Sequence, residues 1–293
     1  MGAHWVVAVN PAAGAKPVGK DRVAKALSDA GVEADIEVPP DRVSMRAVLA
    51  AATTCERLAV VGGDGTVSLA VDTLVGSGHD SLPILGVLPS GMGCDLLRTF
   101  GIPQNLEDAA HHLRGDAVYE VDVGELDGSW GTRRFVNVAE AGIGAAAVVV
   151  ANRLPRLFGA NRYLFSFGLR LPGFRATRIR LETERRTIEG RALAVIFANA
   201  QFFAGGWNIA PKAMLVDGKF DIQVIDVKKT DAPNLIPKVM RGLHLGEKGV
   251  TRTTSSWFRL ETADPWPVEA DGDAIGNTPV HGRVLPAAIR LKI

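Results

Sequence analysis

A glycine-rich string occupies Gly62 to Thr66 and follows directly on the short apolar run 58–61. Glycines allow backbone N–H groups to approach phosphate oxygens without a Cβ in between, and the N-terminus of a following helix adds favourable positive partial charge. The Asp64 carboxylate could hold Mg²⁺ directly or through water, while Thr66 could cap the helix or donate to a phosphate. The string predicts a phosphate-binding turn; the simpler interpretation is an ordinary strand–helix connection.

The first half of the chain alternates between short apolar runs and segments of helical spacing, which predicts a parallel sheet with helices on both faces. In such sheets, ligands bind at the carboxyl ends of the strands, where the glycine-rich turns lie. We expect strands near 5–9, 34–38, 58–61 and 84–88, and helices near 18–30, 43–53 and 66–74.

The second half predicts an antiparallel β-sandwich, because strand-like runs are separated by turn dipeptides such as Asp271-Gly272. The fold class is therefore α/β plus all-β, with an α/β domain over 1–127 and a β-rich domain over 128–283. The last strand, about 284–293, is a candidate to return to the first domain. The expected strands are 178–183, 188–199, 220–227, 257–261 and 284–293, and helical character is expected within 141–171 and 232–245.

Several ordered motifs resemble the diacylglycerol kinase catalytic family, which includes bacterial lipid kinases and sphingosine and ceramide kinases. The run from Asn10 to Gly14 resembles the family's N-P-x-S/A-G loop, and the run from Leu88 to Arg98 resembles its L-P-x-G-T-x-N-D-x-x-R loop. NAD kinases share the string at 62–66, but the order of the other motifs separates the two groups.

This resemblance implies an NAD kinase/diacylglycerol kinase-like fold and an ATP-dependent lipid kinase. Such an enzyme would use Mg²⁺ and transfer the γ-phosphate to the hydroxyl of a diacylglycerol-like or sphingoid-like acceptor. The implied nucleotide-binding residues are Asn10, Gly62, Gly63, Asp64, Gly65, Thr66, Ser90 and Gly91. The implied catalytic residues are Asp64, Asp122 and Asp273, and a second, structural metal site would use Asp217 with the backbone carbonyls of Met214 and Lys219.

Three positions depart from the family pattern. Asp273 stands where the family has a glutamate base, so its carboxylate is set back by roughly 1.5 Å. A base must come within about 3 Å of its proton or act through one water, so Asp273 would need a backbone shift or a bridging water. Alternatively, Asp273 only ties a turn. Met92 and Cys94 replace a hydroxyl and an amide residue of the second loop, and we expect Cys94 to be a small buried thiol.

The two halves differ in charge: acidic residues outnumber basic ones in 1–127, and the remainder is basic. Residues 141–181 lack any acidic residue, and arginines alternate there with aromatic and aliphatic side chains. This composition predicts peripheral membrane contact through 153–180; the alternative is a core-facing helix with solvated arginines. Nucleic acid is an unsuitable partner for so apolar a segment.

The remaining expectations concern location and competing functions. Two cysteines and no recognisable signal peptide predict a cytoplasmic protein that associates peripherally with membranes. The competing functions are a catalytically impaired lipid- or nucleotide-binding homologue and, less favoured, an NAD kinase. Neither the acceptor lipid nor the oligomeric state follows from the sequence.

Overall fold

The computed structural model describes residues 4–14, 18–90, 94–154 and 161–293. The chain divides into two compact units, one of residues 1–121 with 287–293 and the other of residues 122–286. Each unit is described by itself below.

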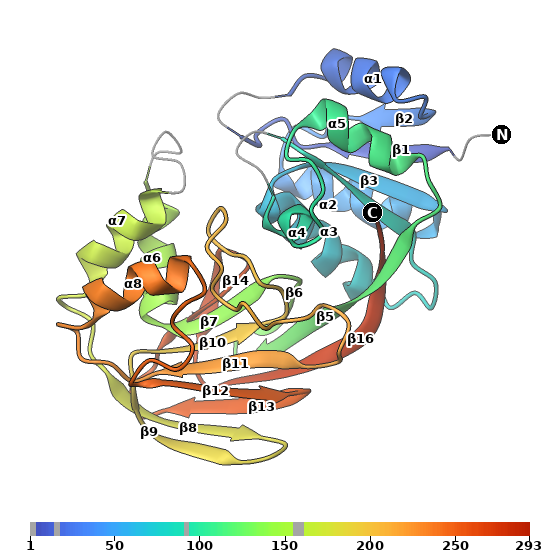
Figure 1. Cartoon of the computed structure of the whole chain (residues 1–293). Helices are drawn as coiled ribbons and strands as arrows, with labels where there is room; N and C mark the ends of the chain where they lie inside the picture. The colour runs from blue at the N-terminus through green and yellow to red at the C-terminus, as the bar shows by residue number, and fades with distance from the viewer. Residues whose placement is uncertain (1–3, 15–17, 91–93, 155–160) are drawn as a thin grey trace. The chain divides into compact units, whose positions relative to one another are not determined.

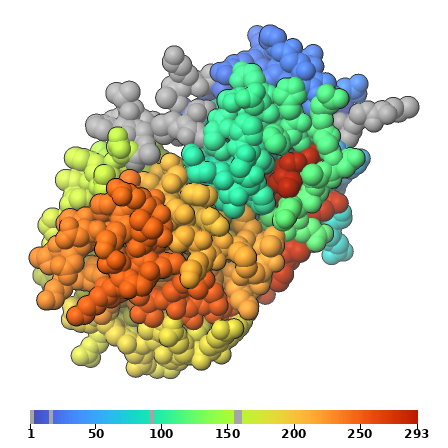
Figure 2. All heavy atoms as spheres, in the orientation of Figure 1, coloured from blue at the N-terminus to red at the C-terminus, as the bar shows by residue number. Residues whose placement is uncertain are grey.

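The first unit is built on a parallel sheet in the order β2-β1-β3-β4, with the end of β16 beside β4 (Figure 1). Strands β1, β3 and β4 are near-continuous apolar runs that are mostly buried, because the middle of a parallel sheet is covered on both faces, whereas no residue of the edge strand β2 is fully buried. The strands are β1 (Trp5–Val9), β2 (Ala34–Glu37), β3 (Arg57–Gly62), β4 (Ile84–Pro89) and β16 (Val280–Lys292). Near the chain end, Lys292 Nζ donates to the Ala117 carbonyl at 3.0 Å, and the red C-terminal residues lie among green ones in Figure 2.

Helices follow the strands of the first unit. Helix α2 packs against α3, and α1 packs against α5. Helix α3 follows the glycine-rich turn, and nine of its side chains are buried, as expected of a helix that is apolar nearly all round. The helices are α1 (Lys20–Asp29), α2 (Arg42–Ala51), α3 (Asp64–Gly76), α4 (Asp95–Thr99) and α5 (Leu106–Ala110), with 3₁₀ turns at Ala52–Thr54 and His111–Leu113.

The second unit contains two sheets of antiparallel strands, which confirms the predicted sandwich. One sheet runs β16-β13-β8-β9, with β5 pairing β16 and β6; the other runs β12-β11-β10-β7-β14-β15. The two sheets share a core, in which Phe197 of β10 stacks on Phe258 of β13 with ring centroids 3.6 Å apart. The strands of this unit, in chain order, are β5 (Val118–Gly128), β6 (Gly131–Phe135), β7 (Val138–Gly142), β8 (Thr177–Thr183), β9 (Thr187–Ala192), β10 (Ala194–Ala198), β11 (Phe220–Ile225), β12 (Val250–Ser255), β13 (Trp257–Thr262), β14 (Pro267–Ala270) and β15 (Asp273–Asn277).

The single strand predicted over 188–199 is wrong, because the chain changes sheets within it. Strand β9 belongs to one sheet and β10 to the other, and Leu193 lies between them. The Leu193 N–H donates to Ile225 and its carbonyl accepts from Ile143, so its backbone groups remain satisfied at the crossing.

Among its described residues, the second unit has three helices: α6 (Ile143–Ala151), α7 (Asn161–Arg170) and α8 (Ala232–Met240). Helix α6 packs against α7. In the part of the chain that the structure describes, no helix has the length and apolar character needed to cross a bilayer.

Candidate functional site

The carboxyl ends of three parallel strands meet at one edge of the first unit. The Asn10 N–H, just after β1, donates to the Val61 carbonyl of β3 at 3.0 Å. The Ser90 N–H, just after β4, donates to the Gly62 carbonyl, also at 3.0 Å. Strands β1, β3 and β4 are in-register parallel neighbours, so residues far apart in the sequence come together here. The structure thus groups Asn10, Ser90 and the turn at 62–66. Gly91 and Met92 lie outside the described residues.

A side-chain bridge connects this edge to helix α3. Asn10 Nδ2 donates to Thr66 Oγ1 at 2.8 Å, while Asn10 Oδ1 accepts from the Ala12 N–H at 3.0 Å. Thr66 is buried and is the third residue of α3, whose N-cap is Gly63 with no side-chain cap. Thr66 therefore does not cap the helix; its hydroxyl accepts from Asn10 and can donate its own proton elsewhere.

The glycines of the turn serve two different purposes. A Cβ at Gly62 would lie 2.2 Å from Thr66 Oγ1, so the protein's own packing excludes a side chain there. Among the described residues, a Cβ at Gly65 would meet no atom within 4 Å, and Gly65 is exposed. A glycine inside a helix costs roughly 0.5–1 kcal/mol relative to alanine. Because no described residue requires glycine at Gly65, the space beside it is a suitable place for a ligand to approach the backbone.

Asp64 opens α3 and is held by the start of α4. Its Oδ1 accepts from the Asp95 N–H at 2.7 Å. Burial raises the pKa of the neighbouring Cys94 thiol well above its usual value, and the negative charge of Asp64 raises that pKa further. Cys94 is fully buried and therefore a neutral thiol, as expected from the sequence.

In the second unit, the segment 215–218 folds around Asp122. The Asp122 N–H donates to the Leu215 carbonyl, and its Oδ2 accepts from the Gly218 N–H, both at 2.7 Å. The buried Asn199 side chain donates to the Asp122 carbonyl at 2.8 Å. These bonds fix the Asp122 carboxylate on this loop.

Asp217 lies close enough to Asp122 for their charges to interact. Burial raises the pKa of Asp217, and the negative charge of Asp122 raises it further, although the Lys219 N–H donates to Asp217 Oδ1 at 3.1 Å. Carboxylate and backbone carbonyl oxygens are ligands for Mg²⁺ and Ca²⁺, so the donor set suits a hard cation. Among the described residues, no three acidic, histidine or cysteine side chains converge, so a cation here would also need backbone carbonyls such as those of Met214 and Lys219.

Asp273, the first residue of β15, also belongs to the second unit. Its Oδ2 accepts from an Arg133 guanidinium nitrogen at 2.9 Å, and its side chain is partly exposed. The turn is tied by Asp271 instead, whose carboxylate accepts from the backbone N–H groups of Val136, Asn137 and Val138. Asp273 therefore lies beside a turn that Asp271 ties to the backbone, and its own carboxylate is paired with Arg133.

A pair of buried glutamates near this turn was not expected from the sequence. Glu140 of β7 and Glu269 of β14 are directly opposite in the antiparallel ladder. Burial raises the pKa of Glu140 to about 7; burial and the charge of Glu140 raise the pKa of Glu269 well above its usual value. Glu140 accepts from the Gly144 N–H at 2.7 Å, and Glu269 accepts from the Gly272 N–H at 2.8 Å, next to Asp273. The feature of the sequence that could have revealed this pair is a single glutamate in each of two otherwise apolar strands.

The arginine-rich segment is not simply a core-facing helix. On α7, Leu164, Phe165 and Leu169 are exposed, whereas Ser166 is buried. Residues 155–160 of the arginine-rich segment lie outside the described part of the chain. Within the described part, Arg180 is paired with Glu182 and Glu189.

Comparisons with known proteins agree with this architecture. A family model described as the diacylglycerol kinase catalytic domain matches residues 4–126, and one described as the YegS C-terminal NAD kinase beta sandwich-like domain matches residues 137–293. Lipid kinase YegS of Escherichia coli (strain K12) is 25% identical over 236 residues, which covers 79% of this chain and 76% of that protein. The probable lipid kinase YegS of Escherichia coli O1:K1 / APEC matches with the same identity and coverage.

Solved structures share the fold along nearly the whole chain. A diacylglycerol kinase-like protein from Bacillus anthracis str. Sterne has a TM-score of 0.80 at 21% identity and covers 98% of this chain and 96% of its own. A second structure from the same organism, described as a diacylglycerol kinase, has a TM-score of 0.74 at 19% identity with the same coverage.

Proposed function

Because the chain belongs to the lipid kinase family that joins a diacylglycerol kinase catalytic domain to a YegS-type C-terminal domain, we propose that it transfers the γ-phosphate of ATP to a lipid hydroxyl. The observation that carries this proposal is the edge of the first unit where Asn10, Ser90 and the turn at 62–66 are hydrogen-bonded together. The acceptor class that we propose is a diacylglycerol-like or sphingoid-like alcohol.

The phosphates of ATP would lie against the start of α3. The exposed backbone at Gly65 has open space beside it, and the first N–H groups of a helix favour negative charge. The bridge from Asn10 to Thr66 fixes the loop after β1 relative to this helix. Phosphoryl transfer depends mainly on positioning and charge neutralisation, so a rigid edge of this kind is the contribution required of the protein.

Two cation sites would support the reaction. At the nucleotide, Mg²⁺ would neutralise charge on the phosphates, and Asp64 is the carboxylate of the first unit placed to hold it. In the second unit, Asp122 and Asp217 with the carbonyls of Met214 and Lys219 would hold a structural cation. Burial, and to a smaller extent the charge of Asp122, raises the pKa of Asp217, and a cation would offset both effects on the charged carboxylate.

We assign the general base to Asp273. Its carboxylate is partly exposed and lies 2.9 Å from an Arg133 guanidinium nitrogen, and it would accept the proton of the lipid hydroxyl. The same ion pair favours one alternative function, a binding protein without turnover, because Arg133 must release the carboxylate or share it for Asp273 to act.

The lipid acceptor would reach the protein from a membrane surface. We propose peripheral contact through the described part of 153–180, because α7 exposes Phe165 and Leu169.

ADP release in the presence of purified lipids that carry a free hydroxyl tests the proposal. We expect ADP release that depends on both Mg²⁺ and one lipid class of the panel. Tight ATP binding with no acceptor-dependent ADP release would favour the binding-protein alternative.

A further inference from the structure

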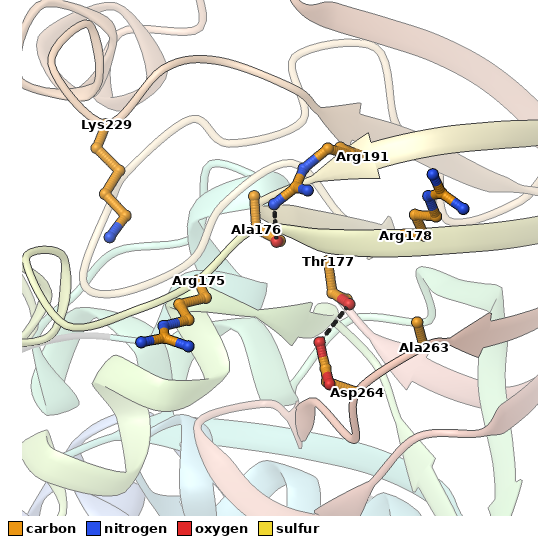
Figure 3. Close-up of a pocket in the computed structure, with 8 residues that line it drawn as sticks. All are labelled: Arg175, Ala176, Thr177, Arg178, Arg191, Lys229, Ala263 and Asp264. Carbon is orange, nitrogen blue, oxygen red and sulfur yellow. Dashed lines mark hydrogen bonds between the residues drawn. The ribbon is translucent and has the colours of Figure 1, made fainter.

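An open pocket of about 640 Å³ lies in the second unit and includes the end of the segment 153–180 (Figure 3). It is formed by the start of β8, the end of β9, the connection from β11 to α8 and the residues just after β13. The charged and polar residues that line it are Arg175, Thr177, Arg178, Arg191, Lys229 and Asp264.

Positive charge dominates this pocket. Four of its lining side chains are cationic and one, Asp264, is a carboxylate. Asp264 Oδ2 already accepts from the Thr177 hydroxyl at 2.8 Å. Neither Arg175 nor Arg178 has an ion pair among the described residues, so the positive charges are not neutralised by acids of the protein itself.

The register of β8 and β9 places two of the positive charges directly opposite each other. Arg178 and Arg191 are directly opposite in the antiparallel ladder, and like charges at such positions destabilise a sheet. The next outward-facing pair along the same ladder, Arg180 with Glu189, is instead an ion pair. Arg191 turns aside and donates to the Ala176 carbonyl at 2.6 Å, as Figure 3 shows. An external anion between these guanidinium groups would remove the repulsion.

An exposed apolar stripe ends beside the pocket. Phe165 and Leu169 of α7 are 53% and 56% exposed, and the exposed Pro172 continues the same i, i+4, i+7 spacing just past the helix. Lys229 Nζ donates to the Pro172 carbonyl at 2.9 Å, so one cation of the pocket is attached to the end of this stripe. Apolar side chains beside clustered arginine and lysine are typical of proteins that lie at a membrane interface.

We propose that this pocket binds the phosphate of an anionic phospholipid headgroup while the stripe Phe165–Leu169–Pro172 contacts the acyl boundary of the same bilayer. Guanidinium groups match phosphate oxygens in charge and in planar, paired geometry. None of the described residues that line the pocket is aromatic, so these residues offer no surface on which nucleic-acid bases could stack. This proposal rests on the proposed function only for the expectation that the protein meets a membrane. Headgroup binding itself requires no catalysis.

Vesicle co-sedimentation without ATP tests this inference. The full chain is mixed with phosphatidylcholine vesicles that either contain or lack phosphatidylglycerol. We compare the wild type with the double variant R175Q/R178Q and with the matched control R180Q/R259Q. The control also removes two exposed arginines from this unit, but those are already paired with Glu189 and Glu261. Thermal unfolding of each variant reports whether it is folded.

We expect the wild type to bind only the vesicles that contain phosphatidylglycerol. The pocket variant should lose roughly 25-fold in affinity, from about fivefold for each of the two charges at an anionic surface, and the control should lose clearly less. Equal losses in both variants, or no loss in either, would overturn the pocket assignment. If inorganic phosphate binds in a way that depends on Arg175 and Arg178 but vesicles do not bind, the ligand of the pocket is free phosphate and not a lipid headgroup, which would overturn the proposal. Because ATP is absent, failure of the kinase proposal would leave this result unchanged.

Discussion

The Asn10 side-chain amide donates to the Thr66 hydroxyl at 2.8 Å, so the residue after β1 is joined to the helix that follows β3. Two strand–loop junctions that are separated by more than fifty residues are thereby fixed to each other by side chains as well as by the sheet. The described part of this edge, where we propose that the phosphates of ATP bind, is therefore held together by the protein's own hydrogen bonds, which would lower the entropic cost of binding.

Gly62→Ala should impair stability, whereas Gly65→Ala should impair ATP binding. A Cβ at Gly62 collides with Thr66, so Gly62→Ala should lower the free energy of unfolding by about 1–3 kcal/mol. A Cβ at Gly65 meets open space, so Gly65→Ala should leave stability unchanged or raise it by up to about 1 kcal/mol, yet weaken ATP binding at least tenfold. Urea unfolding and ATP titration calorimetry measure the two quantities. Unaltered ATP affinity in Gly65→Ala would remove the ligand from this turn.

Asp273 variants test the assigned base. Asp273→Asn should lower kcat by about 10²–10⁴-fold with little change in the KM for ATP, because general base catalysis is lost while nucleotide binding is kept. Asp273→Glu should retain activity or raise it, since the longer side chain restores the reach of the family's glutamate. Steady-state kinetics with the best acceptor of the lipid panel gives both numbers. If Asp273→Asn turns over like the wild type, the base lies elsewhere.

Glu140 should make the second unit less stable as pH rises. Its folded-state pKa is raised from 4.5 to about 7, so the folded state holds a proton that the unfolded state has lost across this window. The free energy of unfolding should therefore fall between about pH 4.5 and pH 7, relative to Glu140→Gln, by up to roughly 3 kcal/mol. Urea unfolding at a series of pH values measures this. The exposed Glu33→Gln variant controls for the chemical change; a parallel pH dependence in wild type and Glu140→Gln would contradict the assignment.

Asp217 should couple cation binding to stability. Addition of Mg²⁺ or Ca²⁺ should raise the melting temperature of the wild type, because a cation that binds only the folded state stabilises it. The effect should be largely lost in Asp217→Asn and kept in Asp226→Asn, which changes an exposed aspartate of the same unit. The stabilisation of the wild type by the cation should also weaken at low pH, since protons compete for the Asp217 carboxylate, whose pKa is raised. If neither Mg²⁺ nor Ca²⁺ changes the melting temperature of the wild type, this cation site is excluded.

Local sequence patterns predicted the first unit well, because each strand, turn and helix there is specified by adjacent residues. The turn at 62–66 follows its strand and opens α3 as expected. The parallel arrangement then places Asn10 and Ser90 at the same edge without any further information.

Sequence reasoning failed where strand register decides the outcome. Glu140 and Glu269 face each other only because β7 and β14 pair in one particular register. The basic pocket likewise combines Arg178 with Arg191 and Lys229, which come from different strands and a connection. Arg180, by contrast, is neutralised by Glu182 of its own strand and by Glu189 of β9. The change of sheet at Leu193 could not be predicted either, because β9 and β10 are both good strands and periodicity does not reveal which sheet each joins.

Transfer of labelled phosphate from γ-³²P-ATP tests the central claim most directly. The protein is incubated with labelled ATP, Mg²⁺ and a total lipid extract, and the organic and aqueous phases are then separated and counted. The account predicts label in an organic-soluble phospholipid, and loss of that label in Gly65→Ala. Label transferred to added NAD, or no transfer to any acceptor by a protein that binds ATP, would contradict it.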